Sequence, residues 1–122
     1  MFTLDRTLRA LGDETRLRIL NLLSRGQLPV ADLIAAMDAP QARISQQLAR
    51  LRSAGLVEDR RQGKSVYYSL CKPRSRVQAK ILGCVRECCG ELAVYRRDLW
   101  RLKNLRPRLK PVGSQKGGLA GL

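Results

Sequence analysis

Apolar residues recur at helical spacing along most of this chain, with one short interval in which they alternate. Three leucines between residues 4 and 11 share one face of a short predicted helix, which Gly12 ends. Asp13 is placed to cap a second helix, in which residues 16–23 carry apolar side chains over most of the circumference. A helix of that kind is buried on several sides, so we predict that it forms the centre of the core.

Residues 30–56 predict a helix, a short turn at residues 37–39 and a second helix. In the second helix Ile44, Leu48 and Leu51 recur at i, i+4 and i+7, so one stripe faces a core and polar residues face away from it. A turn this short is typical of the helix-turn-helix, whose second helix enters a major groove of DNA.

The ends of that second helix are marked by two residues. Pro40 suits the first turn of a helix, and Gly55 suits the left-handed position that ends one. An ordinary helical hairpin within a core has the same pattern, so the DNA-binding interpretation needs support from other parts of the chain.

Beyond residue 55 the spacing changes from helical to alternating. Residues 56–61 and 65–70 predict two strands joined by a turn at residues 61–64. A two-stranded hairpin is marginal alone, so it must pack on the helices. Its tip carries basic residues that suit a phosphate backbone or a minor groove, although a solvated hairpin would also carry them: Arg60, Arg61 and Lys64. A helix-turn-helix followed directly by a basic hairpin indicates a mainly α winged helix-turn-helix with a small β-hairpin wing.

From about residue 74 the helical spacing returns in one long stripe. Its members are Val77, Ile81, Cys84, Val85, Cys88, Leu92, Tyr95, Leu99 and Leu102. A stripe of this length needs a partner. We predict that the partner is the same helix of a second copy with the first helix alongside, which makes a homodimer through the first and last helices. Gly83 and Gly90 would permit either close helix approach or a break in the helix.

Composition narrows the class of partner. The chain has 122 residues, enough for one domain, which we place at residues 1–103 as the DNA-binding and dimerisation domain. Residues 104–122 lack periodicity and are predicted to be a flexible basic tail. Lys and Arg number 24 against 10 Asp and Glu, a net charge of +14, which favours nucleic acid over a membrane surface.

The same features exclude several other classes of protein. The chain has no apolar run of about 18 residues and no signal-peptide core, so we expect a cytoplasmic protein that does not enter membranes. Charge alone would also fit an architectural or RNA-binding protein, but the winged helix favours double-stranded DNA. There is no histidine to act as a base and no Cys-x-x-Cys motif, so an enzyme is not expected.

Three segments resemble the ArsR/SmtB family of winged-helix repressors. They are Ala10-Leu11-Gly12-Asp13-Glu14-Thr15-Arg16-Leu17-Arg18-Ile19-Leu20, then residues 44–57, ISQQLARLRSAGLV, and residues 61–70, RQGKSVYYSL. The resemblance implies a homodimer that binds an inverted-repeat operator and is released by an inducer. By position it also implies that major-groove contacts come from Gln41, Ala42, Arg43, Ser45 and Gln46, where Gln46 suits adenine and Arg43 or Arg50 suits guanine or a phosphate.

The sensor departs from the pattern of the family it resembles. Arsenic-responsive members open the third helix with a Cys-Val-Cys-Asp-Leu-like motif, whereas this chain has Pro29-Val30-Ala31-Asp32-Leu33 there, without a thiol. The histidine-containing zinc site of other members is excluded because the chain has no histidine. Four cysteines remain, and in a reducing cytosol they are metal ligands, redox thiols or small core residues rather than disulfides.

Cys84, Cys88 and Cys89 are the candidate inducer ligands. Cys84 and Cys88 stand at i, i+4, Cys89 lies beside them, and the vicinal pair resembles that of some arsenic sensors in the family. Three thiolates favour trivalent arsenic or antimony, or a soft metal such as cadmium or lead. We expect nearby arginines such as Arg86 to lower the thiol pKa values. Joining all three sulfurs would strain or unwind the helix near Gly90, which would shift the dimer interface and hence the spacing of the DNA-reading helices.

Three alternatives stay open for the cysteines. Cys84 fits a small hydrophobic residue of the stripe. Cys71, which ends the second wing strand, is expected to be structural, with a fourth-ligand or redox role as the alternatives. Oxidation or persulfidation of the same thiols would also release DNA. The predicted function is therefore a homodimeric repressor without a permanent cofactor, released by a thiophilic inducer.

Overall fold

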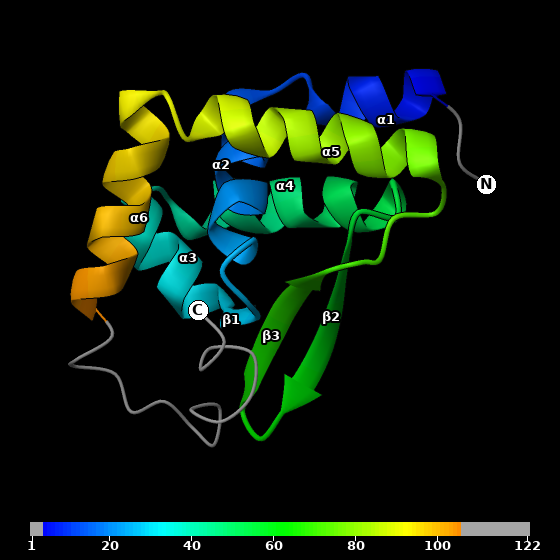
Figure 1. The fold of residues 1–122 in the computed structure, drawn as a ribbon. Coiled ribbons are helices and arrows are strands. Elements are labelled where there is room, and N and C mark those ends of the chain that lie inside the picture. Colours follow the sequence, from blue (N-terminus) through cyan, green and yellow to red (C-terminus); the bar gives the residue numbers. More distant parts are fainter. Residues whose placement is uncertain (1–3, 106–122) are drawn as a thin grey trace.

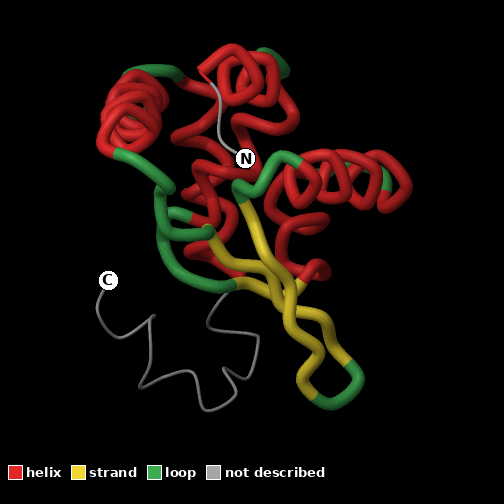
Figure 2. Tube along the Cα trace, turned by 90° about the vertical axis from the view of Figure 1, so that its right-hand side faces the viewer, coloured by secondary structure: helices red, strands yellow, loops and turns green. Residues whose placement is uncertain are grey.

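Six helices lie on one side of a small antiparallel sheet over residues 4–105, which are the residues that this computed structural model describes (Figure 1). In chain order the elements are α1 Leu4–Leu11, α2 Glu14–Leu23, β1 Leu28–Pro29, α3 Val30–Met37, α4 Gln41–Ser53, β2 Val57–Gln62, β3 Ser65–Leu70, α5 Arg76–Cys89 and α6 Ala93–Leu105. The β2–β3 hairpin projects away from the helices, as the view in Figure 2 also shows. The predicted winged helix-turn-helix is confirmed.

Helix α2 lies at the centre of the core, as its apolar circumference predicts. Ile19 and Leu22 are fully buried, and Leu23 is nearly so. Asp13 caps the helix, because its carboxylate accepts a hydrogen bond from the backbone N–H of Arg16 at 3.0 Å. The first helix ends at Leu11, directly before Gly12.

The helix-turn-helix consists of α3 and α4. Asp38 ends α3 in the left-handed conformation, with φ 52°. Pro40 has an extended backbone and stands one residue before α4 rather than within its first turn. At the other end Gly55 has φ +77°, and the backbone N–H groups of Gly55 and Leu56 donate to the carbonyls of Arg52 and Leu51, both at 3.0 Å. These two bonds form a Schellman motif, which confirms the predicted role of Gly55.

The wing belongs to a three-stranded sheet with the order β1-β3-β2. In β1, Leu28 pairs with Tyr68 and so attaches the middle strand to the helical core. Strand β2 begins one residue later than predicted, at Val57, and pairs with β3 through to Gln62 opposite Ser65. The hairpin is therefore supported by β1 as well as by the helices.

The predicted long C-terminal helix is wrong, because the chain turns sharply between α5 and α6 (Figure 1). Gly90 ends α5, and the N–H groups of Glu91 and Leu92 donate to the carbonyls of Cys88 and Cys89 in tight turns. The apolar stripe divides at this point. Tyr95 and Leu102 of α6 are buried in the same chain, whereas Leu92, in the turn between the two helices, is about half exposed. Of the two roles left open for Gly90, the break is the one observed.

The described chain ends with helix α6 at Leu105, two residues beyond the predicted domain boundary. Residues 106–122, which make up most of the predicted basic tail, lie outside the described residues. None of the helices within residues 4–105 is both long and apolar enough to span a membrane.

Candidate nucleic-acid interface and cysteine sites

Helix α4 presents one apolar face inward and one polar face to solvent. Ile44, Leu48 and Leu51 are at most 1% exposed. The side chains predicted to contact DNA are all exposed on the other side: Gln41, Ala42, Arg43, Ser45, Gln46 and Arg50. An exposed polar face on a rigidly buried helix can enter a groove of DNA without rearrangement of the core.

Arg16 fixes the position of α4, a role that the sequence pattern did not reveal. Its Nε donates to the carbonyl of Ala10 at 2.7 Å, and its Nη1 donates to Oε1 of Gln47 at 2.7 Å. One guanidinium on α2 therefore joins the end of α1 to the middle of α4. The signal in the sequence was a charged residue near the start of the helix predicted to form the centre of the core.

A basic hollow of about 400 Å³ lies between α1 and α4. Arg6, Arg9 and Arg50 line it together with Arg16 and small residues of α4. Arg9 also forms an exposed ion pair with Asp5 at 3.7 Å, which is weak at such exposure. The positive surface beside α4 thus extends onto α1, which the sequence analysis did not predict.

The wing tip carries its basic residues as predicted. Arg60, Arg61 and Lys64 are all exposed. Nη2 of Arg60 donates to Oε1 of Gln27 at 3.1 Å and is thereby held against the base of the sheet. Within the described part of the chain, Arg61 and Lys64 have no side-chain hydrogen bond or ion pair, so their charges are available to a phosphate.

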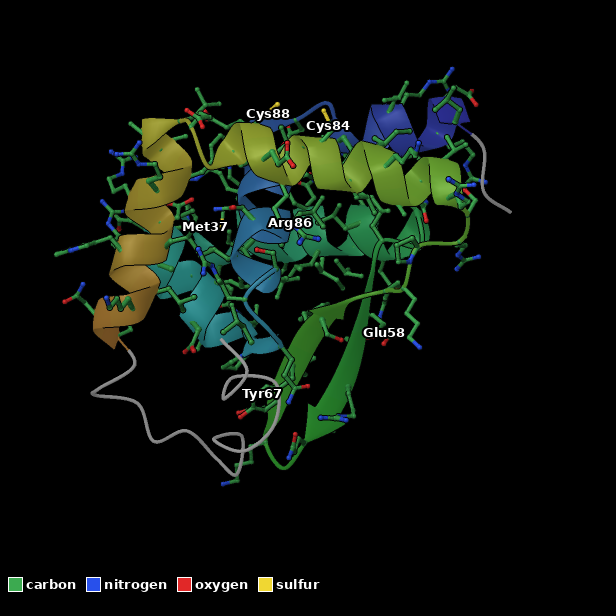
Figure 3. The ribbon with its side chains drawn as sticks, viewed as in Figure 1. Met37, Glu58, Tyr67, Cys84, Arg86 and Cys88 are labelled. Atoms are coloured by element: carbon green, nitrogen blue, oxygen red, sulfur yellow. The ribbon has the colours of Figure 1, made fainter. Side chains whose placement is uncertain are left out.

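The cysteines of α5 lie on two different faces of the helix. Cys84 and Cys88 are exposed on its outer side (Figure 3), and their side chains are close enough to hydrogen-bond. Cys89 is 4% exposed and lines a cavity together with Cys71. Among residues 4–105, no group of three or more Cys, Asp or Glu side chains is already arranged around a metal position.

The pKa values of Cys71, Cys88 and Cys89 are raised, which corrects the prediction that nearby arginines lower the thiol pKa values. The pKa of Cys88 is raised mainly by the neighbouring Cys84 and further by burial, by the hydrogen bond with Cys84 and by Glu87 and Glu91. Burial raises the pKa of Cys89, and Cys88 adds to it. Arg86 points to the inner side of α5, away from Cys84 and Cys88 (Figure 3), and is not among the groups that shift the pKa of Cys88.

Burial is also the main cause of the raised pKa of Cys71. Glu58 raises that pKa further, while Arg74 opposes the shift. Cys71 and Cys89 are therefore protonated thiols at neutral pH.

Helices α1 and α5 together form an outer layer with exposed apolar side chains. Nε2 of Gln78 donates to Oγ1 of Thr7 at 3.3 Å, and both side chains are buried between the two helices. Leu4, Leu8 and Val77 are each about half exposed on this layer. Exposed leucine and valine side chains of this kind are typical of a surface that another molecule covers.

Helix α6 is joined to the helix-turn-helix by Arg18 of α2. Its guanidinium binds the buried carboxylate of Asp98 on α6 with Nε at 2.7 Å. Its Nη2 also donates to the carbonyl of Met37, the last residue of α3, at 3.0 Å. A movement of α6 would therefore reach the turn that precedes α4.

Comparison with known proteins gives matches to transcription regulators. The profile of the family described as "Bacterial regulatory protein, arsR family" matches residues 13–59. The chain is 47% identical over 81 residues to the arsenical resistance operon repressor of Escherichia coli K12, covering 66% of this chain and 69% of that protein. It is also 51% identical over 61 residues to a transcriptional repressor SmtB homolog of Synechocystis. That match covers 50% of this chain and 46% of the relative.

The fold is similar to that of a solved regulator. The structure of HlyU from Vibrio cholerae superposes with a TM-score of 0.61 at 31% sequence identity. The match covers 69% of this chain and 88% of that one. The likeness therefore extends over most of the described residues.

Proposed function

The chain belongs to the ArsR family of bacterial regulatory proteins, and we propose that it is a homodimeric repressor released from its operator by trivalent arsenic or antimony. Regulators of this family bind DNA and are not enzymes, so the prediction that the chain is not an enzyme is confirmed. The observation that carries the DNA-binding part of the proposal is the exposed polar face of α4 above its fully buried apolar stripe.

DNA recognition is assigned to α4, with the wing as a second contact. Gln46 is placed to pair with an adenine, and Arg43 or Arg50 with a guanine or a phosphate. Arg61 and Lys64 at the wing tip contact the phosphate backbone beside the groove. In a twofold dimer, two copies of α4 read half-sites about one helical turn apart.

The dimer is proposed to form through the outer layer of α1 and α5. Three exposed apolar residues on that layer support it: Leu4, Leu8 and Val77. The buried bond between Thr7 and Gln78 makes the two helices one unit, so a partner would dock on both at once. The exposed Cys84 and Cys88 lie on the same helix as Val77, about two and three turns away, so inducer binding and dimer contact share α5.

DNA selection from a random duplex pool tests this part of the proposal. We expect the selected duplexes to share an inverted repeat and to bind at least about a thousandfold more tightly than scrambled duplexes at the same salt concentration. Gln46→Ala should relax the preference at one position of each half-site, whereas the exposed α5 variant Glu87→Ala should leave it unchanged. Selected duplexes without a common sequence would indicate an architectural protein instead.

Cys84, Cys88 and Cys89 are the proposed inducer ligands. In water trivalent arsenic is As(OH)₃, and each thiol that binds it replaces one hydroxyl. Three As–S bonds therefore form, three waters leave, and no electrons are transferred. Each thiol supplies the proton that the departing hydroxyl needs to leave as water. A donor set of sulfur alone favours this class of ion over magnesium or calcium.

Ion binding must rearrange the end of α5, since Cys89 faces inward while Cys84 and Cys88 face outward. Cys89 is the last residue of the helix, directly before Gly90, so unwinding the final turn is the shortest route to a common position. Unwinding the final turn of α5 also moves the turn that leads into α6. Arg18 then transmits the movement from Asp98 to the carbonyl of Met37 and so to the helix-turn-helix.

An inducer titration identifies the ion. Operator-bound protein is titrated with arsenite, antimonite, cadmium, zinc and hydrogen peroxide, and release of DNA is measured by fluorescence anisotropy. We expect arsenite and antimonite to release DNA at the lowest concentrations and zinc to be ineffective. Release by cadmium alone would contradict the metalloid assignment and support a soft-metal sensor.

A thiol-redox repressor is the second candidate, favoured by the closeness of Cys84 and Cys88. Two thiols give two electrons and two protons to hydrogen peroxide, which yields one S–S bond and two waters. In the same titration, release by peroxide without any metalloid, reversed by dithiothreitol, would support this candidate. Persulfide donors would act on the same sulfurs.

A further inference from the structure

A cavity of about 420 Å³ lies between α2, α5 and the base of the wing. This volume is within the range of sites that bind small organic molecules. Aliphatic side chains from these elements make up most of its wall: Leu17, Leu20, Leu56, Leu70, Leu82 and Val85. Arg86, which lines the cavity, points to the inner side of α5, away from Cys84 and Cys88 (Figure 3).

The charged groups of this cavity are all of one sign. Arg86 and Lys72 line it, and no Asp or Glu is among the described residues of its wall. Both cations are exposed, as expected at the mouth of a cavity. Within residues 4–105, the Arg86 guanidinium has no hydrogen bond or ion pair, so it can bind a ligand.

The other polar groups of the wall are already occupied or neutral. Nδ2 of Asn21 donates to the carbonyl of Tyr95 at 3.3 Å, and Oγ of Ser24 donates to the carbonyl of Asn21 at 2.5 Å. The two thiols of the wall, Cys71 and Cys89, carry no charge at neutral pH because burial raises their pKa values. They add soft apolar surface to the leucines.

We propose that this cavity binds a small apolar monoanion, an aliphatic or aromatic carboxylate. The hydrocarbon part lies among the leucines, and the carboxylate binds Arg86 at the mouth, with Lys72 as the second cation. A planar guanidinium can bind a carboxylate through two parallel hydrogen bonds. A cation would be repelled at this mouth, and a multiply charged phosphate would leave the apolar wall unoccupied. This site is separate from the DNA surface; it shares Cys89 with the proposed inducer ligands, but its test needs no inducer.

Octanoate and octanol are suitable probes, because they share a hydrocarbon chain and differ in charge. Each is titrated below its micelle concentration into methyl-labelled protein, and the methyl NMR signals of Leu82, Val85 and Ala79 report occupation of the cavity. We expect octanoate to shift these signals saturably and to bind about tenfold more tightly than octanol.

Two variants locate the carboxylate. Arg86→Gln should weaken octanoate about tenfold and leave octanol unchanged, since only the carboxylate needs the guanidinium. Arg76→Gln is the matched control, because Arg76 is an exposed arginine of the same helix outside the cavity wall. Ala79→Leu narrows the cavity and should weaken both ligands.

The results that would overturn the proposal are distinct from these. The proposal would be overturned if octanoate, at the highest concentration below its micelle concentration, shifted none of the methyl NMR signals of the cavity. Equal weakening by Arg86→Gln and Arg76→Gln would do so as well, because it would show only attraction of an anion to a chain with a net charge of +14.

Discussion

Arg18 and Asp98 form a two-pronged ion pair between residues 80 positions apart in the sequence. Nε of Arg18 lies 2.7 Å from Oδ2 of Asp98, and Nη2 lies 2.8 Å from Oδ1. The Asp98 side chain has no solvent exposure. The pair fixes α6 against α2 and, through the bond from Arg18 to Met37, against the end of α3.

Removing one member of this pair should strongly destabilise the fold. Asp98→Ala leaves a largely buried guanidinium without its counter-charge, so we expect the free energy of unfolding to fall by about 3–5 kcal/mol. Asp59→Ala is the matched control, because Asp59 pairs with the exposed Arg52 at 3.1 Å and should cost about 0–1 kcal/mol. Urea unfolding followed by circular dichroism measures both. Similar costs for the two variants would contradict the role given to Arg18.

Gly83 is expected to be replaceable by alanine with a gain in stability. A Cβ at this position would meet nothing within 4 Å, and the residue lies inside α5, so Gly83→Ala should stabilise by about 0.5–1 kcal/mol. Gly55→Ala should destabilise by roughly 1–2 kcal/mol, because φ is +77° and the Arg74 guanidinium lies 3.1 Å from the added carbon. Weaker dimerisation of Gly83→Ala in sedimentation would instead show that a partner helix packs against Gly83.

Stability should fall in alkaline solution as the buried thiols ionise. The folded pKa of Cys89 lies above its ordinary value of 9.0, so between these two values the folded state holds more protons than the unfolded state. Its contribution to stability is therefore complete below about pH 9 and is lost as the pH rises through the folded pKa. In Cys89→Ala the loss of unfolding free energy between about pH 8 and pH 10 should be smaller than in the parent protein. Equal losses would contradict the burial effect.

The wing should contribute to affinity without contributing to sequence preference. Arg61→Gln and Lys64→Gln should each weaken operator and scrambled duplexes by similar factors and reduce the slope of log K against log salt by about 1. Anisotropy titrations at several salt concentrations measure this slope. Lys80→Gln is the control, because Lys80 is an exposed lysine of α5 outside the proposed DNA interface. A change in base preference on removing Arg61 or Lys64 would indicate direct contact with a base.

Local signals explain why most of the fold could be predicted from the sequence. Asp13 and Gly55 act within a few residues of themselves, so the ends of α2 and α4 follow from nearby residues alone. The break after Cys89 did not follow in this way, because the apolar spacing continues through Leu92 to Leu102. Gly90 has φ −64°, a helical value, so the break arises from the packing of α6 on α2 and α3 rather than from a special backbone conformation.

The candidate sites also divide into a part that local spacing predicts and a part that depends on long-range packing. The outward positions on α4 follow from the inward stripe, since a helix with one buried face has an exposed one. The direction of Cys89 and Arg86 depended on which face of α5 meets the wing and α2, and this contact joins distant parts of the chain. For that reason the sequence placed three cysteines near one another but did not separate Cys84 and Cys88 from Cys89.

Release of the operator by arsenite in cysteine variants tests the central claim most directly. Arsenite is titrated into operator complexes of the parent protein and of three variants, Cys84→Ala, Cys88→Ala and Cys89→Ala. Cys71→Ala is titrated in the same way for comparison. We predict that each of the first three variants keeps its DNA affinity but needs at least about tenfold more arsenite for release, while Cys71→Ala responds as the parent does. Unchanged release in the variants of Cys84, Cys88 and Cys89 would contradict the claim that these thiols decide when the protein leaves DNA.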